Sequence, residues 1–272
     1  MWKIAVLGTG RMGAAIAHRL FASGHSLTVW NRTAARTEPL SRIGVAVAGS
    51  PADAVGGVDV ALTMLADPAA VDTVLFGPGG AASALAPGAC LVEMSTIGPA
   101  AVRALVDRLP EGSLVDAPVA GSVTAASSGR LRVYAGGPTV AVEHVRPLLE
   151  TLGTVRHLGP VGSGAAAKLV LNAALLIGVG GVADTLAVAR SVGVDRDVAL
   201  DLLGTGPLGA ALARATTADA DFPVALAEKD LGLVLDELAG TAAPLVRAAR
   251  AVLAAAPDPT ADIAALTTLE RP

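Results

Sequence analysis

Short apolar runs alternate with helix-like stretches over the first 160 residues of the chain. Each run is rich in strand-forming residues and ends in a loop. The clearest runs are 3–7 (KIAVL), 26–30 (SLTVW), 59–65 (DVALTML), 89–95 (ACLVEMS) and 113–119 (SLVDAPV), and shorter ones lie in YAGGP and TVRHLG before residue 160. This alternation predicts an α/β fold with a doubly wound parallel sheet.

The strand pattern stops near residue 160, where alanine, leucine and valine take over with helical spacing. We expect two domains, 1–162 and 163–272, the second all-helical and beginning with a long inter-domain helix over about 164–191. That helix is apolar around most of its circumference, which predicts burial between domains or subunits and favours a homodimer. The apolar run 169–183 is shorter than the ~20 residues of a membrane span, and it contains Asn172 and three glycines. We therefore expect a buried helix and no membrane partner.

A glycine-rich turn follows the first predicted strand. Gly8, Gly10 and Gly13 fit the pattern G-x-G-x-x-G between a strand and a helix. In a dinucleotide-binding domain of the Rossmann type, the first glycine allows the turn, the second lets the backbone approach a pyrophosphate, and the third allows close helix packing. The pattern alone is weak, but the flanking strand and helix support it. We interpret domain 1–162 as a dinucleotide-binding domain.

The end of the second predicted strand bears on the choice of cofactor. An NAD site usually carries an acidic residue at this point for the ribose 2′-hydroxyl. Here the chain has Asn31, Arg32 and Thr33, which offer a cation and two hydrogen-bonding side chains to a 2′-phosphate. We therefore expect NADP(H) to be preferred over NAD(H). The alternative is a polar turn with no such role.

Ligands of doubly wound sheets bind beyond the carboxyl ends of the strands. The residues at those ends are therefore candidates for the cofactor and substrate site: Met64, Leu65, Ser95, Thr96 and the loop 116–122.

Lysine is rare in this chain, because among its 20 basic residues only Lys3, Lys168 and Lys229 are lysines. Lys168 and Asn172 are four residues apart and share one face of the long predicted helix. A lysine whose pKa is lowered by apolar surroundings can donate a proton to a carbonyl oxygen. From spacing alone, this role and that of a lysine extending its ammonium into water are equally supported.

Composition excludes several other classes. The formal charge of −4 and an aromatic content of 2% argue against a nucleic-acid partner. Cys90 is the only cysteine, which fits a reducing cytosol, and the N-terminal segment has no signal-peptide cleavage site, so we expect a cytoplasmic protein. No histidine has metal-ligand spacing, and we expect no metal. No histidine accompanies the serines in a hydrolase motif.

The motifs together resemble the β-hydroxyacid dehydrogenase family, which includes 3-hydroxyisobutyrate dehydrogenases and glyoxylate and succinic semialdehyde reductases. The resemblance covers nearly the whole chain, with seven motifs in the family's order. They are GTGRMGAAIAHRL, WNRT, TML, EMSTIGP, DAPVAGS…SSGRL, GSGAAAKLVLN and DFPVALAEKDLGLVL.

The resemblance implies roles for individual positions. Lys168 matches the family's proton donor and acceptor, and Asn172 matches an asparagine that helps to hold the substrate. Further substrate positions are Thr96, Gly121, Ser122, Phe222 and Asp230. The cofactor positions marked by the motifs and the resemblance are Gly8, Gly10, Arg11, Met12, Gly13, Asn31, Arg32, Thr33, Met64, Leu65, Ser95, Thr96 and Lys229. The implied activity is interconversion of a small hydroxy acid and its aldehyde or oxo acid.

One position departs from the family pattern. The substrate loop of the family begins with serine, whereas this chain has Ala120 before Gly121 and Ser122. The loss of a hydroxyl leaves two alternatives open. One is an imine reductase-like enzyme, although such enzymes usually lack the lysine, and the other is a non-catalytic NADPH-binding protein.

Overall fold

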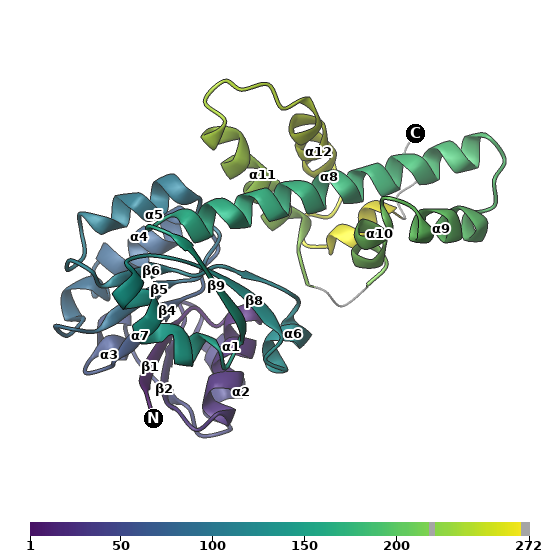
Figure 1. Cartoon of the computed structure of the whole chain (residues 1–272). Helices are drawn as coiled ribbons and strands as arrows, with labels where there is room; N and C mark the ends of the chain where they lie inside the picture. The colour runs from purple at the N-terminus through teal and green to yellow at the C-terminus, as the bar shows by residue number, and fades with distance from the viewer. Residues whose placement is uncertain (218–220, 268–272) are drawn as a thin grey trace. The chain divides into compact units, whose positions relative to one another are not determined.

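A computed structural model describes residues 1–217 and 221–267 of the chain. The chain forms two compact units, Met1–Lys168 and Leu169–Pro272. The first unit is an α/β domain and the second is helical (Figure 1).

The first unit is built on a sheet that has nine strands within the described residues. The strands are β1 (Lys3–Leu7), β2 (Ser26–Trp30), β3 (Ala46–Val47), β4 (Val60–Thr63), β5 (Cys90–Glu93), β6 (Leu114–Asp116), β7 (Val119–Ala120), β8 (Leu131–Gly136) and β9 (Gly153–Gly159). Their order is β3-β2-β1-β4-β5-β6-β8-β7, and β9 pairs with β8. The pairs from β3 to β6 are parallel, which confirms the predicted doubly wound sheet.

Both faces of this sheet are buried, which explains why its strands read as continuous apolar runs. Ile4 and Val6 of β1 pack on one face, against α1 (Arg11–Ala22), α6 (Val123–Ser127) and α7 (Thr139–Leu149). Ala5 and Leu7 pack on the other face, against α3 (Pro51–Val55), α4 (Pro68–Phe76) and α5 (Pro99–Val106). The short helices η1 (Ala34–Thr37), α2 (Glu38–Ser41) and η2 (Ala82–Ala84) lie in the connections.

One edge of the sheet departs from the parallel prediction. β8 runs antiparallel to β6 and β7 and parallel to β9. The connection from β6 to β8 contains only the two-residue β7 and the five-residue α6. Neighbouring parallel strands are usually joined by a crossover that contains a longer α-helix. The chain therefore turns back beside β6, which places loop 117–122 at the carboxyl end of β6.

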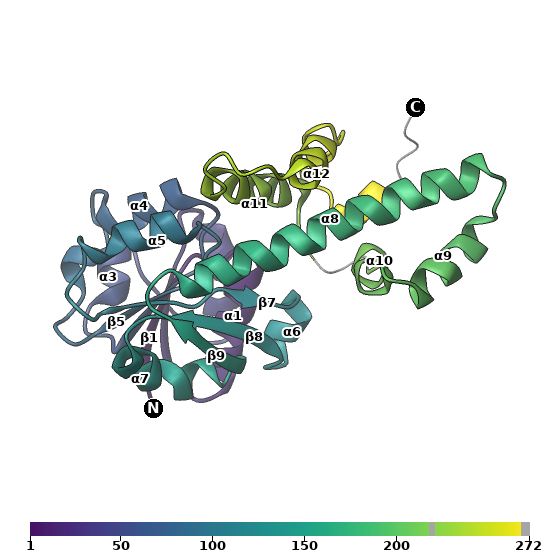
Figure 2. The ribbon, with the colours of Figure 1, turned by 45° about the horizontal axis from the view of Figure 1, so that its top comes forward.

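The second unit packs around the long helix α8 (Ser163–Ser191), which starts in the first unit and continues into the second. Leu176, Val179 and Val182 of α8 are buried in its core. The remaining elements are α9 (Arg196–Thr205), α10 (Gly209–Ala215), α11 (Val224–Glu237), α12 (Pro244–Ala254) and η3 (Ile263–Thr267). The two helices α11 and α12 form a packed pair, seen side by side in Figure 2.

Helix α8 also has exposed apolar positions within the chain. Val170 is 71% exposed and Val188 is 58% exposed. By length and composition alone this helix could span a membrane, a test that core helices of soluble proteins also pass. Its buried leucines and valines belong to the core of the second unit.

Candidate functional site

The glycine turn connects β1 to α1 in the geometry that the sequence predicts. Gly8 has a φ of 103°, and a Cβ at this position would overlap the carbonyl oxygen of Met64. A Cβ at Gly13 would overlap the carbonyl oxygen of Gly8. The N–H of Gly8 donates a 2.8 Å hydrogen bond to the carbonyl of Trp30, so the turn is fixed to the end of β2. Both glycines are therefore required by close backbone contacts.

The N-terminus of α1 is suited to an anionic ligand. Gly10 occupies the N-cap, no side chain caps the helix, and its first turn carries no acidic residue. A Cβ at Gly10 would meet no atom within 4 Å, so this face of the turn is open. Arg11, the first residue of the helix, is exposed, and Met12 is half-buried. The uncapped N–H groups and the open glycine fit the pyrophosphate of a dinucleotide.

The side chain of Asn31 braces the glycine turn. Its Oδ1 accepts a 3.0 Å hydrogen bond from the N–H of Thr9, and its Nδ2 donates to the carbonyl of Thr33 at 3.0 Å. Sequence reasoning assigned Asn31 directly to the cofactor, and this bracing role depends on a contact across 22 residues. The side chains of Arg32 and Thr33 are exposed at the same strand end.

Arg36 is a residue that sequence reasoning missed. It lies on η1, its side chain is exposed, and its carbonyl accepts a 3.2 Å hydrogen bond from the hydroxyl of Thr9. The signal in the sequence was a second arginine shortly after Arg32, in the segment that follows the second predicted strand.

The ends of β4 and β5 are connected through Ser95 and Glu93. The hydroxyl of Ser95 accepts a 2.8 Å hydrogen bond from the N–H of Leu65. The carboxyl group of Glu93 accepts hydrogen bonds of 2.6 Å from the N–H of Ser95 and from the hydroxyl of Thr63. The predicted cofactor positions Leu65 and Ser95 are thus in direct contact, while Thr96 lies half-buried beside them.

Glu93 is fully buried and was not singled out from the sequence. Burial raises its pKa to about 7, which outweighs the lowering by hydrogen bonds from Ser95 and Thr63; the charge of Asp116 adds to the rise. The signal in the sequence was an acidic residue at the end of an apolar run, and Asp116 occupies the same position on the neighbouring strand. Burial also raises the pKa of Asp116. Hydrogen bonds from backbone N–H groups, chiefly those of Gly162 and Ala165, lower the pKa but do not cancel this rise.

The predicted substrate loop lies at the carboxyl end of β6. Gly121 has a φ of 139°, and a Cβ at this position would lie 2.8 Å from a methyl group of Leu131. The hydroxyl of Ser122 caps α6 by accepting a 3.2 Å hydrogen bond from the N–H of Ala125. Ala120 and Ser122 are both half-buried.

Lys168 belongs to the first unit and contacts this loop. Its Nζ donates a 2.8 Å hydrogen bond to the carbonyl oxygen of Val119, two residues before Gly121. The side chain is half-buried. The structure therefore brings together the predicted proton donor and the predicted substrate loop, and it does not extend Lys168 freely into solvent.

In the second unit, three predicted residues meet. Asn172 and Asp230 are buried, at 4% and 3% exposure, and the Nδ2 of Asn172 donates to Oδ2 of Asp230 at 2.5 Å. The ammonium of Lys229 lies 2.6 Å from Oδ1 of the same carboxylate. These contacts link α8 to α11.

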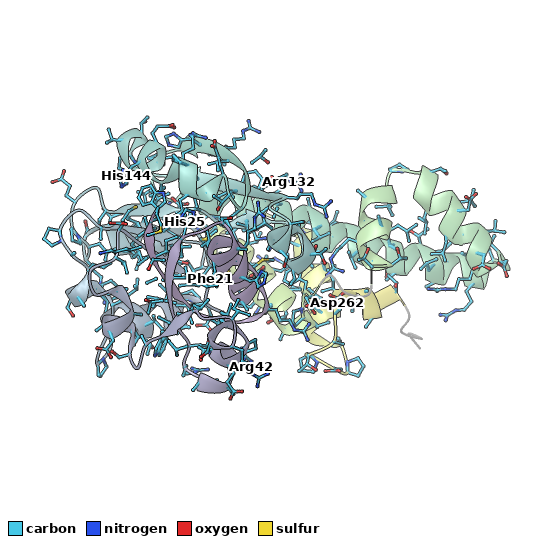
Figure 3. The ribbon with its side chains drawn as sticks, turned by 90° about the horizontal axis from the view of Figure 1, so that it is seen from below. Phe21, His25, Arg42, Arg132, His144 and Asp262 are labelled. Carbon is cyan, nitrogen blue, oxygen red and sulfur yellow. The ribbon has the colours of Figure 1, made fainter. Side chains whose placement is uncertain are left out.

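Phe222, another predicted site residue in the second unit, is held by a residue that sequence reasoning missed. Its N–H donates a 2.8 Å hydrogen bond to Asp262, which is labelled in Figure 3 and also receives two 2.9 Å hydrogen bonds from Arg214. Burial alone would raise the pKa of Asp262, but the hydrogen bonds from Arg214, Phe222 and Ala264 lower it. Because Asp262 lies 40 residues from Phe222, no local pattern indicated this contact.

Within residues 1–217 and 221–267, no group of three or more His, Cys, Asp and Glu side chains is placed to hold a metal ion.

Two family models match the chain. The NAD-binding domain of 6-phosphogluconate dehydrogenase matches residues 3–187, and the NAD-binding domain of NADP-dependent 3-hydroxyisobutyrate dehydrogenase matches residues 162–266. The first match covers the whole α/β unit, which makes it an NAD(P)-binding domain.

Curated relatives match three quarters of the chain. The NAD-dependent L-serine dehydrogenase of Pseudomonas aeruginosa is 34% identical over 75% of this chain and 69% of its own length. The chloroplastic glyoxylate/succinic semialdehyde reductase 2 of Arabidopsis thaliana is 32% identical over 76% of this chain and 59% of its own length. The cytokine-like nuclear factor N-PAC of Xenopus tropicalis is 32% identical over 76% of this chain, and the match spans only 39% of that protein.

Solved structures match over nearly the full length. 3-Hydroxyisobutyrate dehydrogenase of Mycobacterium tuberculosis with L-serine has a TM-score of 0.86 at 27% identity, covering 98% of each chain. Psf3 in complex with NADP+ and 2-OPP has a TM-score of 0.87 at 25% identity, covering 97% of this chain and 99% of the other. An imine reductase of Myxococcus stipitatus with NADP+ has a TM-score of 0.70 at 24% identity, covering 98% and 99%, and shares the fold.

The family model matches residues 3–187, a range that includes both the glycine turn and the Lys168 segment of α8, and the relatives above 30% identity point to the same family. The chain belongs to the β-hydroxyacid dehydrogenase family.

Proposed function

We propose that the protein is an NADP(H)-dependent oxidoreductase that interconverts a small hydroxy acid and its aldehyde or oxo acid, with Lys168 as the general acid and base. The observation that carries the proposal is the hydrogen bond from the Lys168 ammonium to the carbonyl of Val119, beside Gly121 and Ser122. It sets a proton donor against a loop able to hold a small polar substrate, on a domain that binds NAD(P).

The nicotinamide of the bound cofactor supplies or accepts a hydride at the carbon that changes oxidation state. In reduction, Lys168 donates a proton from Nζ to the carbonyl oxygen as that carbon becomes an alcohol carbon. In oxidation, neutral Lys168 accepts the hydroxyl proton. An ammonium has three N–H donors, so one can remain on Val119 while another faces the substrate.

Ser122 and Asn172 are proposed to hold the substrate. The Ser122 oxygen accepts the N–H of Ala125 and its own O–H proton can be donated to a carboxylate. Ala120 offers no such donor, so we expect fewer contacts to the carboxylate than in relatives with serine there. In the second unit, Asn172 is held in one orientation by Asp230.

The proposed preference for NADP(H) depends on Arg32 and Arg36. Both side chains are exposed, that of Arg32 directly after β2 and that of Arg36 on η1, and the adenosine ribose of a dinucleotide binds at this strand end in the fold. A guanidinium binds a 2′-phosphate with charge-assisted hydrogen bonds. NAD(H) is the alternative cofactor, because one relative is named as an NAD-dependent L-serine dehydrogenase.

A homodimer is proposed because the second unit exposes large apolar side chains that a second copy would cover. They include Val170, Val188, Val192, Val198 and Leu202. A reducing, cytoplasmic location is also proposed. It is supported by Cys90 being the only cysteine in the sequence, so that the chain can form no intramolecular disulfide.

The test is a turnover panel with NADPH and NADH. Glyoxylate and succinic semialdehyde would be tested for reduction, 3-hydroxyisobutyrate and L-serine for oxidation, and a cyclic pyrroline for imine reduction. We expect turnover of at least one hydroxy or oxo acid with NADPH. Turnover of the pyrroline alone would replace the proposal with an imine reductase. Tight NADPH binding without any turnover would replace it with a cofactor-binding protein.

A further inference from the structure

Asp116 connects the sheet of the first unit to the start of α8. It is the last residue of β6 and is fully buried. Its Oδ1 accepts a 2.7 Å hydrogen bond from the N–H of Gly162, and its Oδ2 accepts a 2.7 Å hydrogen bond from the N–H of Ala165. The first N–H groups of a helix have no partner inside the helix. A carboxylate from 46 residues earlier in the chain therefore caps α8.

Two glycines leave room for this carboxylate. A Cβ at Gly136 would overlap Oδ1 of Asp116, and a Cβ at Gly164 would lie 2.9 Å from Oδ2. The backbone of β8 and the first turn of α8 thus both approach the carboxylate as closely as glycine allows. Such a fit fixes the position of the helix start relative to the sheet.

The same segment that carries Asp116 also contacts Lys168. Val119 follows Asp116 by three residues, and its carbonyl accepts the hydrogen bond from Nζ of Lys168 at 2.8 Å. Lys168 in turn follows Ala165 by three residues, about one helical turn. Segment 116–119 therefore holds α8 at two levels: the Asp116 side chain holds the first turn, and the Val119 main chain holds the lysine.

We propose that Asp116 is a positioning residue for Lys168, whose carboxylate fixes the first turn of α8 so that the lysine ammonium meets both the Val119 carbonyl and the substrate. The inference rests on the proposed role of Lys168. Asp116 does not touch the substrate, and its effect on turnover passes through the lysine. Removing an acceptor from Asp116 frees the helix start and misplaces the ammonium, which slows proton transfer without weakening cofactor binding.

The test is a double-mutant cycle. Asp116→Asn and Asp116→Ser each keep one acceptor, and Asp116→Ala keeps none; each is made with Lys168 and with Lys168→Ala. The substrate is whichever of glyoxylate and succinic semialdehyde is turned over faster. With Lys168 present, we expect kcat to fall about tenfold or more in Asp116→Asn and further in Asp116→Ala. On the Lys168→Ala background, the same Asp116 substitutions should lower kcat less than about threefold relative to Lys168→Ala alone.

Two measurements separate positioning from general damage to the fold. The Kd for NADPH should change less than about twofold, because a lost positioning contact acts on the reacting geometry alone. Hydrogen exchange of the amides at 162–168 should accelerate, while that of the β1–α1 segment stays unchanged. Asp67→Asn is the matched control, because Asp67 caps α4 through a 2.7 Å hydrogen bond from the N–H of Ala70 and should leave kcat unchanged.

Equal losses of kcat on both backgrounds would overturn the positioning role while leaving Lys168 in place. If Asp116→Ala does not fold, the Asn and Ser variants, which keep a cap, still decide the question. Full activity of Lys168→Ala would instead overturn the proposed function, so the two failures are distinguishable.

Discussion

The ammonium of Lys168 donates a hydrogen bond to the carbonyl oxygen of Val119, 49 residues earlier in the chain. This contact places a protonated amine against the loop that contains Gly121 and Ser122. A half-buried lysine held in this way loses rotamer freedom before the substrate arrives, which is an advantage when geometry sets the rate of proton transfer.

Replacement of Arg32 by alanine should weaken NADPH binding and leave NADH binding nearly unchanged. The guanidinium is proposed to contact only the 2′-phosphate, which NADH lacks. Hydrogen bonds to charged groups are typically worth enough for a loss of about tenfold to hundredfold in affinity. Fluorescence titration of both cofactors measures the change.

Arg42→Ala is the control for Arg32. Arg42 is exposed after α2 in the same unit and pairs with Glu38 at 3.3 Å, with 77% and 60% of the two side chains exposed (Figure 3). This variant should bind both cofactors as the wild type does. If Arg32→Ala lowers the affinity for NADH as much as for NADPH, Arg32 does not read the 2′-phosphate.

Glu93 should make the stability of the first unit depend on pH. Its pKa is about 7 in the folded state against an ordinary value of 4.5. Between these values the folded protein keeps a proton that the unfolded chain releases. Its contribution is therefore fully present below pH 4.5 and is lost as pH rises through 7, with a total change of roughly 3 kcal/mol.

Glu93→Gln should remove this pH dependence. A glutamine oxygen can accept the N–H of Ser95, and its amide can donate to Thr63. Trp2 and Trp30 are the two tryptophans of the chain, and both lie in the first unit, so their fluorescence reports its denaturant unfolding at pH 5 and pH 8. If the free energy of unfolding changes by the same amount between pH 5 and pH 8 in Glu93→Gln as in wild type, Glu93 is not the source of the pH dependence.

Asp230→Ala should raise the KM for the substrate, because it leaves the buried Nδ2 of Asn172 without its acceptor. Such a loss costs roughly 1–3 kcal/mol, and we expect an increase in KM of about tenfold. Asp230→Asn keeps an acceptor oxygen and should recover most of the effect. Glu228→Ala is the control on α11, since Glu228 pairs with Arg250 at 2.6 Å; an equal rise in KM there would contradict a specific role of Asp230.

Asp262→Asn should loosen the segment that contains Phe222. The carboxylate receives two hydrogen bonds from Arg214 and one from the N–H of Phe222. Because hydrogen bonds lower the folded-state pKa of Asp262, its contribution is present above its ordinary pKa of 3.8 and is lost as pH falls through the lowered value.

Hydrogen exchange at pH 7 of the amides of Phe222 and of residues 224–226 measures this loosening, and a weakening of roughly 1–3 kcal/mol is expected. Asp258→Asn is the control, since Asp258 is exposed and accepts the N–H of Thr260 at 2.8 Å in the same C-terminal segment. Unchanged exchange in Asp262→Asn would mean that Arg214 and the backbone hold Phe222 without it.

The sequence predicted those parts of the fold that depend on local patterns. The apolar runs indicated the parallel strands, and the spacing of Gly8, Gly10 and Gly13 indicated the turn before α1. The rarity of lysine and the family motifs pointed to Lys168. These signals are local because strand burial, tight turns and helix periodicity are set by neighbouring residues.

The contacts that support the site were not predicted, because they join residues far apart in the sequence. In the sequence, Glu93 and Asp116 are acidic residues near the ends of two separate apolar runs. Only the sheet register reveals that they are neighbours. Asn31 was predicted as a cofactor residue, and its further contact, the hydrogen bond that its side-chain oxygen accepts from the N–H of Thr9, had no signal in the sequence. The direction of β8 depended on the short return through β7 and α6, which no periodicity indicates.

The central claim is that Lys168 moves the proton, and single-turnover kinetics of Lys168→Ala and Lys168→Arg test it most directly. Arginine keeps the charge but does not release its proton in the accessible pH range. If Lys168 is the general acid, both variants should bind NADPH normally and reduce glyoxylate or succinic semialdehyde about 10²- to 10⁴-fold more slowly than wild type. A wild-type rate of reduction in either variant would contradict the account.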